Sequence, residues 1–260
     1  MYQPLRVVQI TDTHLFADPH QVLVGCPTWV TLAKVLEQVQ LFQPDLLLLT
    51  GDLSQDETPA SYQNLVDLLR PLTCPIYWLG GNHDQPELLT QTLTAGGLRP
   101  DKTFVQGGWR FILLHSPVPG AVGGLLAAAE LAYLEQVLHQ SSEPTLIALH
   151  HPLFPVGSPW LDDSALANPE QFWHIGDAHP QVKLVLCGHV HQERRWQRRG
   201  VTYLSSPSTC IQFAPQAQAF TLDTAFPGFR WLELDPQGNF RTGVTRVPCQ
   251  WVVDAQATGY

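Results

Sequence analysis

The chain has 260 residues, of which 44% are hydrophobic and 14% are charged, and its formal net charge at pH 7 is −9. This composition is ordinary for a globular protein, and the length allows one large α/β domain or two small ones. The acidic balance disfavours stable binding of nucleic acid or acidic membranes, because such binding needs clustered Lys and Arg. A small phosphate substrate stays open, since metal ions can supply positive charge locally.

The cysteines and the N-terminal residues bear on the cellular location that we expect for the protein. The five cysteines are scattered and none forms a Cys-x-x-Cys pair, which argues against a disulfide framework and a thiolate zinc site. We expect reduced thiols in a cytoplasmic protein. A strand is predicted from Leu5 onward, so the N-terminus lacks the regions of a signal peptide, and no apolar stretch approaches the roughly 20 residues of a membrane helix.

Strand-like and helix-like segments alternate through most of the chain. The predicted strands of this part are Leu5–Ile10, Asp45–Thr50, Ile76–Leu79, Thr103–Gln106, Trp109–His115, Thr145–His150 and Lys183–Cys187. The predicted helices are Thr28–Phe42, Ser61–Leu69, Glu87–Leu93, Leu131–His139 and Pro169–Ala178. Gly107-Gly108 predicts a hairpin between the two strands that flank it.

After Gly188 the pattern changes to hairpins. Their predicted strands are Gln192–Gln197 with Val201–Ser205, and Phe229–Leu234 with Phe240–Val247. Alternating β and α followed by a β meander, without a repeat or a linker, predicts one α/β domain over residues 1–247. We expect a four-layer αββα sandwich, in which helices flank two mixed β-sheets, and a loosely held C-terminal tail over residues 248–260.

Polar clusters follow five of the predicted strands. They are Thr11-Asp12-Thr13-His14, Gly51-Asp52, Gly80-Gly81-Asn82-His83-Asp84, His150-His151-Pro152 and Gly188-His189-Val190-His191. Ligands of an open α/β sheet bind outside the carboxyl ends of its strands, so these clusters are expected to face one crevice. A single Asp or His in such a place is usually a turn former or a surface residue. Five clusters of metal-competent groups without a cysteine indicate a site.

Seven candidate metal ligands stand in these clusters: Asp12, His14, Asp52, Asn82, His150, His189 and His191. Seven exceed what one transition-metal ion accepts, whereas two ions that share a bridging carboxylate would use them all. Oxygen and nitrogen ligands without thiolate favour Fe, Mn or Zn over a soft metal. Two such ions, roughly 3.5–4 Å apart, are a device for in-line displacement at phosphorus.

The ordered motifs Asp-x-His, Gly-Asp, Gly-Asn-His-Asp, His-His-Pro and Gly-His-x-His resemble those of the calcineurin-like metallophosphoesterase superfamily. Four longer stretches resemble the bacterial class III 3′,5′-cyclic-AMP phosphodiesterases: QITDTHLFA at 9–17, HHPLFPVGSPWLDD at 150–163, LCGHVHQE at 186–193, and PSTCIQF with FTLDTAFPGFRWLEL between 207 and 234. The resemblance runs nearly end to end. One departure is His115-Ser116, where relatives usually carry an Asp-Ser pair.

The resemblance implies how the ligands divide. One ion would be held by Asp12, His14 and His191, and the other by Asn82, His150 and His189, with Asp52 as the bridge. His150 is preferred to His151 because the family's ligand is the first residue of its His-x-Pro motif. The expected cofactors are two divalent ions per chain, Fe²⁺ and/or Mn²⁺, with Zn²⁺ as the alternative. The residues expected to contact the substrate are His14, Asp52, Asn82, His83 and His191.

The expected activity is metal-dependent hydrolysis of 3′,5′-cyclic AMP to 5′-AMP, in which metal-activated hydroxide attacks phosphorus. His83 is the expected general acid, because it follows the ligand Asn82 without being a ligand and the family assigns the role to this His. Asp84 is expected to orient or charge-stabilise that imidazole. The resemblance also implies that a homodimer is possible, since several relatives dimerise.

Two other functions stay open. One is a broader phosphodiesterase that acts on glycerophosphodiesters, 2′,3′-cyclic nucleotides or small nucleic-acid fragments. The other is a non-catalytic metal-binding interaction protein, which the complete ligand set and His83 disfavour. Among weaker features, Trp160, Phe172 and Phe213 could stack on a purine, although packing is their more usual role. Similarly, the arginines Arg194, Arg195, Arg198 and Arg199 favour a solvated hairpin over a phosphate contact.

Overall fold

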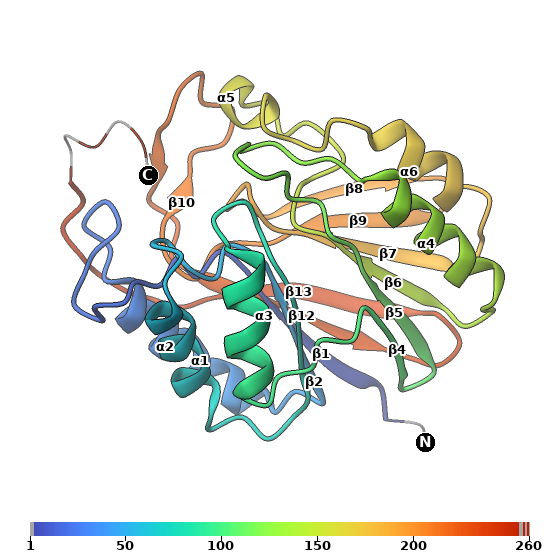
Figure 1. Cartoon of the computed structure of the whole chain (residues 1–260), viewed down its shortest axis with the longest axis horizontal. Helices are drawn as coiled ribbons and strands as arrows, with labels where there is room; N and C mark the ends of the chain where they lie inside the picture. Colours follow the sequence, from blue (N-terminus) through green and yellow to red (C-terminus); the bar gives the residue numbers. More distant parts are fainter. Residues whose placement is uncertain (1–2, 255–256, 258, 260) are drawn as a thin grey trace.

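The first of two facing β-sheets has five strands in the order β13-β12-β1-β2-β3. In the computed structural model, which describes residues 3–254, 257 and 259, these are β1 (Leu5–Ile10), β2 (Leu46–Thr50), β3 (Ile76–Leu79), β12 (Gly228–Leu234) and β13 (Phe240–Arg246). β1, β2 and β3 are parallel, and β12 pairs antiparallel with β1 and with β13. Three helices cover the outer face of this sheet: α1 (Thr28–Phe42), α2 (Pro59–Leu69) and α3 (Pro86–Ala95) (Figure 1).

The second sheet has six strands in the order β4-β5-β6-β7-β9-β8. They are β4 (Thr103–Gln106), β5 (Trp109–Leu113), β6 (Thr145–Ala148), β7 (Val182–Cys187), β8 (Arg194–Arg198) and β9 (Val201–Ser205). The outer strands β4 and β8 are antiparallel to their neighbours, and the four between them are parallel. Helices α4 (Ala128–His139) and α6 (Pro169–Gly176) cover its outer face. The short elements α5 (Pro159–Asp162), β10 (Gln212–Phe213) and β11 (Leu222–Asp223) complete the fold.

The alternation of side chains along each strand builds three hydrophobic layers. In β2, Leu46 and Leu48 pack between the sheets, while Leu47 and Leu49 pack under helices α1 to α3. All four are buried because β2 is a central strand that is covered on both faces. A third layer lies between the second sheet and helices α4 and α6. The predicted αββα sandwich of two mixed sheets is confirmed.

Most predicted elements are present, and the differences lie at their ends. β5 ends at Leu113 and β6 at Ala148, two residues before the predicted ends. Helix α2 begins at Pro59 because the side chain of Thr58 accepts a hydrogen bond from Ser61 N and proline suits the first helical position. Helix α5 and the β10–β11 pair were not predicted, since four- and two-residue elements leave no periodicity to detect.

The predicted tail begins at a buried segment. Val247 and Cys249 belong to the hydrophobic layer under α1 to α3, and Asp254 N donates to Val24 O over 3.2 Å. Residues 255, 256, 258 and 260 of the predicted tail lie outside the described residues. The division into a domain over 1–247 and a tail over 248–260 stays a prediction.

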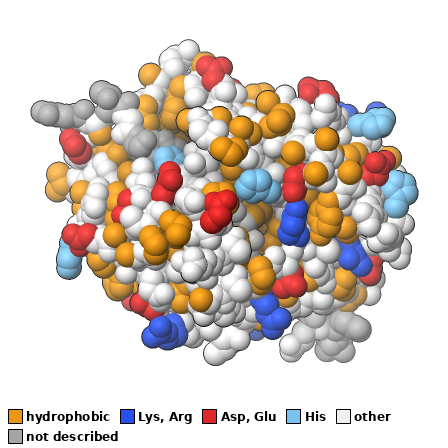
Figure 2. All heavy atoms as spheres, viewed as in Figure 1, with side chains coloured by type: hydrophobic (Ala, Val, Ile, Leu, Met, Phe, Trp, Pro, Cys, Tyr) orange, Lys and Arg blue, Asp and Glu red, His pale blue; other side chains and the backbone are white. Residues whose placement is uncertain are grey.

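The surface carries charges of both signs. On the face shown in Figure 2, Lys and Arg are scattered among acidic side chains rather than gathered in a patch. Among the described residues, no helix combines the length and the apolar character needed to cross a membrane.

Candidate dinuclear metal centre

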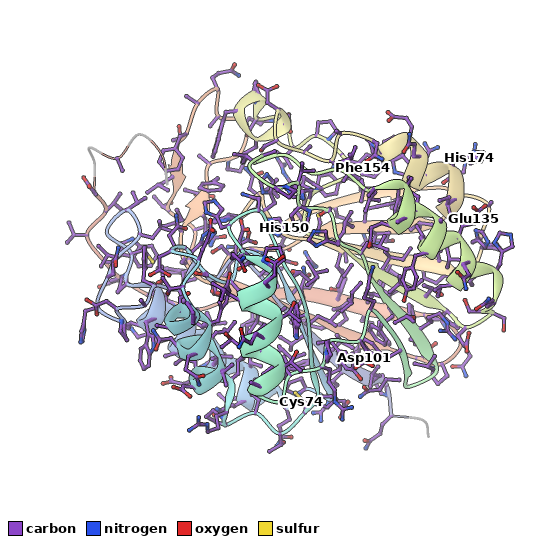
Figure 3. All side chains as sticks on the ribbon, viewed as in Figure 1. Cys74, Asp101, Glu135, His150, Phe154 and His174 are labelled. Carbon is purple, nitrogen blue, oxygen red and sulfur yellow. The ribbon has the colours of Figure 1, made fainter. Side chains whose placement is uncertain are left out.

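The predicted ligands converge at the carboxyl ends of strands from both sheets. Asp12 and His14 follow β1, Asp52 follows β2, Asn82 follows β3, His150 follows β6, and His189 and His191 follow β7. Figure 3 shows His150 near the middle of the molecule, close to the first turn of α3, whereas Cys74 and Asp101 lie toward the other end of that helix. All seven are buried except Asn82, which is partly exposed.

The first ligand set consists of the predicted ligands Asp12, His14 and His191, whose ligand atoms lie within 4.8 Å of one another. The Nδ1 atom of His14 lies 2.6 Å from Gln55 Oε1, and the Nδ1 atom of His191 lies 2.9 Å from the Ile211 carbonyl oxygen. Because these oxygens can only accept, each ring carries its proton on Nδ1 and turns Nε2 into the site. The two Nε2 atoms are 3.2 Å apart. Ligands at 2.0–2.1 Å around a tetrahedral ion would be about 3.3 Å apart, so the pair is spaced for a cation.

The second ligand set consists of the predicted ligands Asn82, His150 and His189, and Asp52 is the predicted bridge. His150 and His189 also form a candidate metal group with His151. The Nδ1 atom of His150 donates to Thr50 O over 2.9 Å, which leaves Nε2 3.2 Å from both Asn82 Oδ1 and Asp52 Oδ2. Asp52 Oδ2 is also 3.9 Å from His14 Nε2 and therefore lies between the two sets.

Two buried atoms of these ligands lack the partner that burial requires. Asp52 Oδ2 and His189 Nδ1 have no partner with hydrogen-bond geometry among the described residues, and Asp52 Oδ2 makes ion-pair contacts with His150 Nε2 at 3.2 Å and His14 Nε2 at 3.9 Å. Buried polar atoms are nearly always paired, so each orphan calls for an ion or another ligand. Because each atom belongs to a predicted ligand, the residues present fit two divalent cations, one in each set, with Asp52 between them.

Electrostatics keeps Asp52, His14 and His189 in the protonation states that metals bind, and His150 is the exception. Burial would raise the pKa of Asp52, but the imidazoles of His150, His83 and His14 hold it well below its usual range. Burial lowers the pKa of His14 to about 3 and that of His189 well below its ordinary value. Burial lowers the pKa of His150, but the carboxylates of Asp52 and Asp12 and the hydrogen bond to the Thr50 carbonyl together raise this pKa to about 9. A cation bound there would therefore displace a proton, as metal binding commonly does.

The ligand-bearing backbone is strained. Asp12, His14, Asp52, His189 and His191 have φ values of 56°, 45°, 51°, 68° and 47°. This left-handed region costs a non-glycine residue on the order of 1 kcal/mol, and such residues gather at functional sites. Five of the seven predicted ligands thus share an unfavourable backbone conformation.

Two motif glycines allow the loops to approach each other. A Cβ atom on Gly51 would lie 2.4 Å from His150 Nδ1, and one on Gly81 would lie 2.1 Å from Asp52 Oδ1. Gly51 also has a φ of 94°, which other residues rarely adopt. Any side chain at either position would move a predicted ligand.

The turn after Asn82 holds His83 and Asp84. The ring of His83 is partly exposed, 5.1 Å from that of His14 between centroids, and its backbone N donates to Asp52 Oδ1 over 2.9 Å. The buried carboxylate of Asp84 accepts hydrogen bonds from the backbone amides of Gly81, Leu53 and Ser54. These contacts join the turn to the end of β2. The acid role of His83 and the orienting role of Asp84 stay predictions.

His151 lies beside the centre, next to the rings of His150 and His189, whereas His115 lies at the surface. His151 Nδ1 contacts Ser116 Oγ at 2.8 Å and Nε2 contacts Val122 O at 3.0 Å, whereas His150 Nε2 lies beside two predicted ligands, which favours His150 as the ligand. His115 is exposed, and its backbone N donates to Glu130 Oε2. With Gly80 and Lys102 it lines a cavity of about 260 Å³.

The weaker sequence candidates have structural partners. Phe172 and Phe213 are fully buried, and Phe213 stacks on the His191 ring with centroids 4.2 Å apart, so they serve as packing residues. Trp160 packs edge-on against Phe213. In the arginine cluster, Arg198 and Arg199 pair with Asp177, and Arg194 donates to Val156 O. These contacts fit the solvated hairpin.

Several supporting residues were missed from the sequence. Gln55, Ile211 and Ser164 contact the second ring nitrogen of a predicted ligand. Gln55 stands three residues after Asp52, which gave a faint signal, whereas Ser164 and Ile211 reach their partners only through the fold.

The αββα sandwich and the groups of Asp and His side chains that could hold metal ions are typical of a metal-dependent phosphoesterase. Residues 5–193 match the calcineurin-like phosphoesterase family, and the chain belongs to that family. It is therefore a hydrolase.

Close relatives are similar over nearly the whole chain. A 3′,5′-cyclic-nucleotide phosphodiesterase of Nostoc sp. is 44% identical over 258 residues, covering 98% of this chain and 97% of that protein. The 3′,5′-cyclic adenosine monophosphate phosphodiesterase CpdA of Escherichia coli K12 is 40% identical over 261 residues, covering 98% and 95%. The crystal structure of a dimetal phosphatase from Danio rerio shares the fold, with a TM-score of 0.71, 15% identity, and coverage of 98% of this chain and 100% of that one.

Proposed function

We propose that the chain hydrolyses 3′,5′-cyclic AMP to 5′-AMP at the strand-end centre. The observation that carries the proposal is the pair of buried atoms Asp52 Oδ2 and His189 Nδ1, which lack a partner with hydrogen-bond geometry and belong to groups of side chains that could hold a metal ion. The relatives' activity on cyclic nucleotides supports the choice of substrate. When bound, the two ions would lower the pKa of a water molecule and neutralise charge on the phosphoryl oxygens.

The residues of the chain have distinct tasks in the proposed reaction. Asp12, His14 and His191 hold one ion, Asn82, His150 and His189 hold the other, and Asp52 lies between them. Water gives up one proton to the solvent as its oxygen adds to phosphorus, the bond from phosphorus to the 3′-oxygen breaks with its electron pair on that oxygen, and His83 gives a proton to it. The partly exposed ring of His83, fixed at its backbone by Asp52, suits a proton donor at the mouth of a buried centre.

The proposed contacts to the substrate phosphate come from the same residues: His14, Asp52, Asn82, His83 and His191. Asn82 and His83, in the turn after β3, are partly exposed. The other three side chains are buried. Within this proposal, Asp84 supports His83 through the turn whose backbone amides it binds.

The native cofactors, location and assembly are also proposed. Fe²⁺ and/or Mn²⁺ suit a set of carboxylate, amide and imidazole ligands, and Zn²⁺ is the alternative. A cytoplasmic location fits the five free cysteines. A homodimer would appear as a doubled mass in light scattering of the purified protein.

The test is metal reconstitution followed by turnover. Protein stripped of metal is loaded with Fe²⁺, Mn²⁺ or Zn²⁺, and kcat/KM is measured on cyclic AMP, cyclic GMP, 2′,3′-cyclic AMP and a glycerophosphodiester. We expect the highest value on cyclic AMP. A higher value on another diester would overturn the proposed substrate, and no turnover with any loaded metal would favour a non-catalytic protein.

A further inference from the structure

His189 faces the metal centre the opposite way from the other candidate histidine ligands. His14, His150 and His191 each place Nδ1 against an oxygen acceptor and present Nε2. In His189 it is Nε2 that meets the protein, 2.9 Å from Ser164 Oγ, and Nδ1 that is buried without a described hydrogen-bond partner. The orientation of this ring therefore depends on Ser164.

The single proton of the Ser164 hydroxyl decides the tautomer. Ser164 Oγ lies 2.9 Å from the carbonyl oxygen of Leu161, which can only accept, so the hydroxyl donates there. The same oxygen can then only accept from His189 Nε2–H. A neutral imidazole carries one proton, and Nδ1 is left with its lone pair. The reverse arrangement would bury an N–H group at Nδ1 without a described acceptor and leave the Leu161 carbonyl without this hydroxyl.

We propose that Ser164 is a positioning residue that fixes His189 as the Nε2–H tautomer and turns Nδ1 toward the ion shared with Asn82 and His150. The partner of the second ring nitrogen commonly sets the tautomer and basicity of a metal-binding histidine. This inference rests on the proposed metal centre and does not depend on cyclic AMP as the substrate.

The segment between His150 and Ser164 is built to hold the hydroxyl in place. Ser164 N donates to Leu161 O over 3.0 Å, at the end of the short helix α5. The carboxylate of Asp162 in that helix accepts hydrogen bonds from Val156 N and Gly157 N, which folds the segment back on itself. The segment thus begins with His150, a predicted ligand of the second ion, and ends with Ser164, which contacts His189, another predicted ligand of that ion.

The loop that contains Gly124 also fixes the segment around Ser164. Gly124 N donates to Ala165 O over 3.3 Å, and Ala167 N donates to Gly124 O over 2.8 Å. The residues next to Ser164 are therefore pinned by backbone hydrogen bonds that do not involve its side chain. Replacing the hydroxyl alone should leave this framework intact.

The variants Ser164→Thr and Ser164→Val isolate the hydroxyl, because the two side chains have nearly the same shape and only Thr keeps the oxygen. Ser164→Ala is the simple truncation. Ser141→Ala is the matched control, since the Ser141 hydroxyl also donates to a backbone carbonyl, that of Val137 in α4, away from the metal ligands. Circular dichroism and the melting temperature of metal-free protein report folding.

The first readout is metal binding, measured by calorimetric titration of metal-free protein with Mn²⁺. We expect Ser164→Ala and Ser164→Val to lower the affinity for one of the two ions by about 10–100-fold. Ser164→Thr and Ser141→Ala should bind both ions as tightly as the unaltered protein does. Binding of both ions by Ser164→Val as tightly as by Ser164→Thr would overturn the proposal. Should Ser164→Ala not fold, the Thr and Val pair decides.

The second readout is the tautomer itself. Long-range ¹H–¹⁵N correlation spectra of metal-free protein, assigned with a His189→Gln variant, should show His189 protonated at Nε2 in the unaltered protein and in Ser164→Thr. In Ser164→Val this pattern should change. Protonation of His189 at Nδ1 in the unaltered protein would refute the inference. If both readouts hold while cyclic AMP is not cleaved, the proposed substrate fails and the role of Ser164 stands.

Discussion

Removing the metal ions should destabilise the whole fold, because the centre lies inside it. Six of the seven predicted ligands are buried, and Asp52 Oδ2 and His189 Nδ1 have no described hydrogen-bond partner. A buried polar atom without a partner costs roughly 1–3 kcal/mol. Cations that bind the folded chain and not the unfolded one would add to the free energy of unfolding.

The size of the effect follows from linkage. An ion at 100 times its dissociation constant adds about 2.7 kcal/mol, so two independent ions add about 5 kcal/mol. For a chain of this size, 1 kcal/mol corresponds to roughly 2–4 °C in melting temperature. Stripping both ions should therefore lower the melting temperature by about 10–20 °C.

The assay is a thermal melt of chelator-treated protein, with and without added Mn²⁺, beside the variant Asp52→Asn. The amide oxygen of Asn can still accept from His83 N, but its neutral side chain is a poor bridge between two cations. We expect Asp52→Asn to melt near the metal-free protein and to gain little from Mn²⁺. A full Mn²⁺-dependent rise in this variant, or no rise in the unaltered protein, would refute the reasoning.

Three further predictions concern single side chains. His83→Gln should keep both ions by metal analysis and lose about 10²–10⁴-fold in kcat on a diester, because the departing oxygen lacks its acid; near-normal turnover would exclude the acid role. Gly81→Ala should lose bound metal, because its Cβ would come within 2.1 Å of Asp52 Oδ1, whereas the control Gly176→Ala meets nothing closer than 3.6 Å and should keep it. Leu48→Ala, buried between the sheets, should lower the free energy of unfolding by about 2–5 kcal/mol in urea titration, and a loss below 1 kcal/mol would contradict its place in that layer.

The sequence predicts the fold and the first layer of the site because both are local patterns. The leucines of β2 identify a central strand, and a polar cluster directly after it marks the strand's carboxyl end. Asp52 and Asn82 could thus be placed at one edge before any contact was known. The family resemblance then divided the ligands between two ions.

The supports of the ligands could not be predicted, since they depend on contacts between distant segments. Ser164 is 25 residues from His189 in sequence, and Ile211 O is 20 residues from His191. No periodicity or motif links such pairs. A left-handed φ is equally hidden, because Asp and His adopt it only where tertiary structure imposes it.

The strained backbone persists because the loops after β1 and β2 continue the ladder of these strands. Beyond the last residue of β1, Asp12 N donates to Gly51 O, His14 N to Asp52 O and Leu15 N to Leu53 O, at 2.9, 3.0 and 3.1 Å. Left-handed residues on the two loops are therefore fixed to each other by main-chain bonds that need no metal. The fold itself holds Asp12, His14 and Asp52 in place, so a cation would meet a prepared set of ligands and would not have to order the loops first.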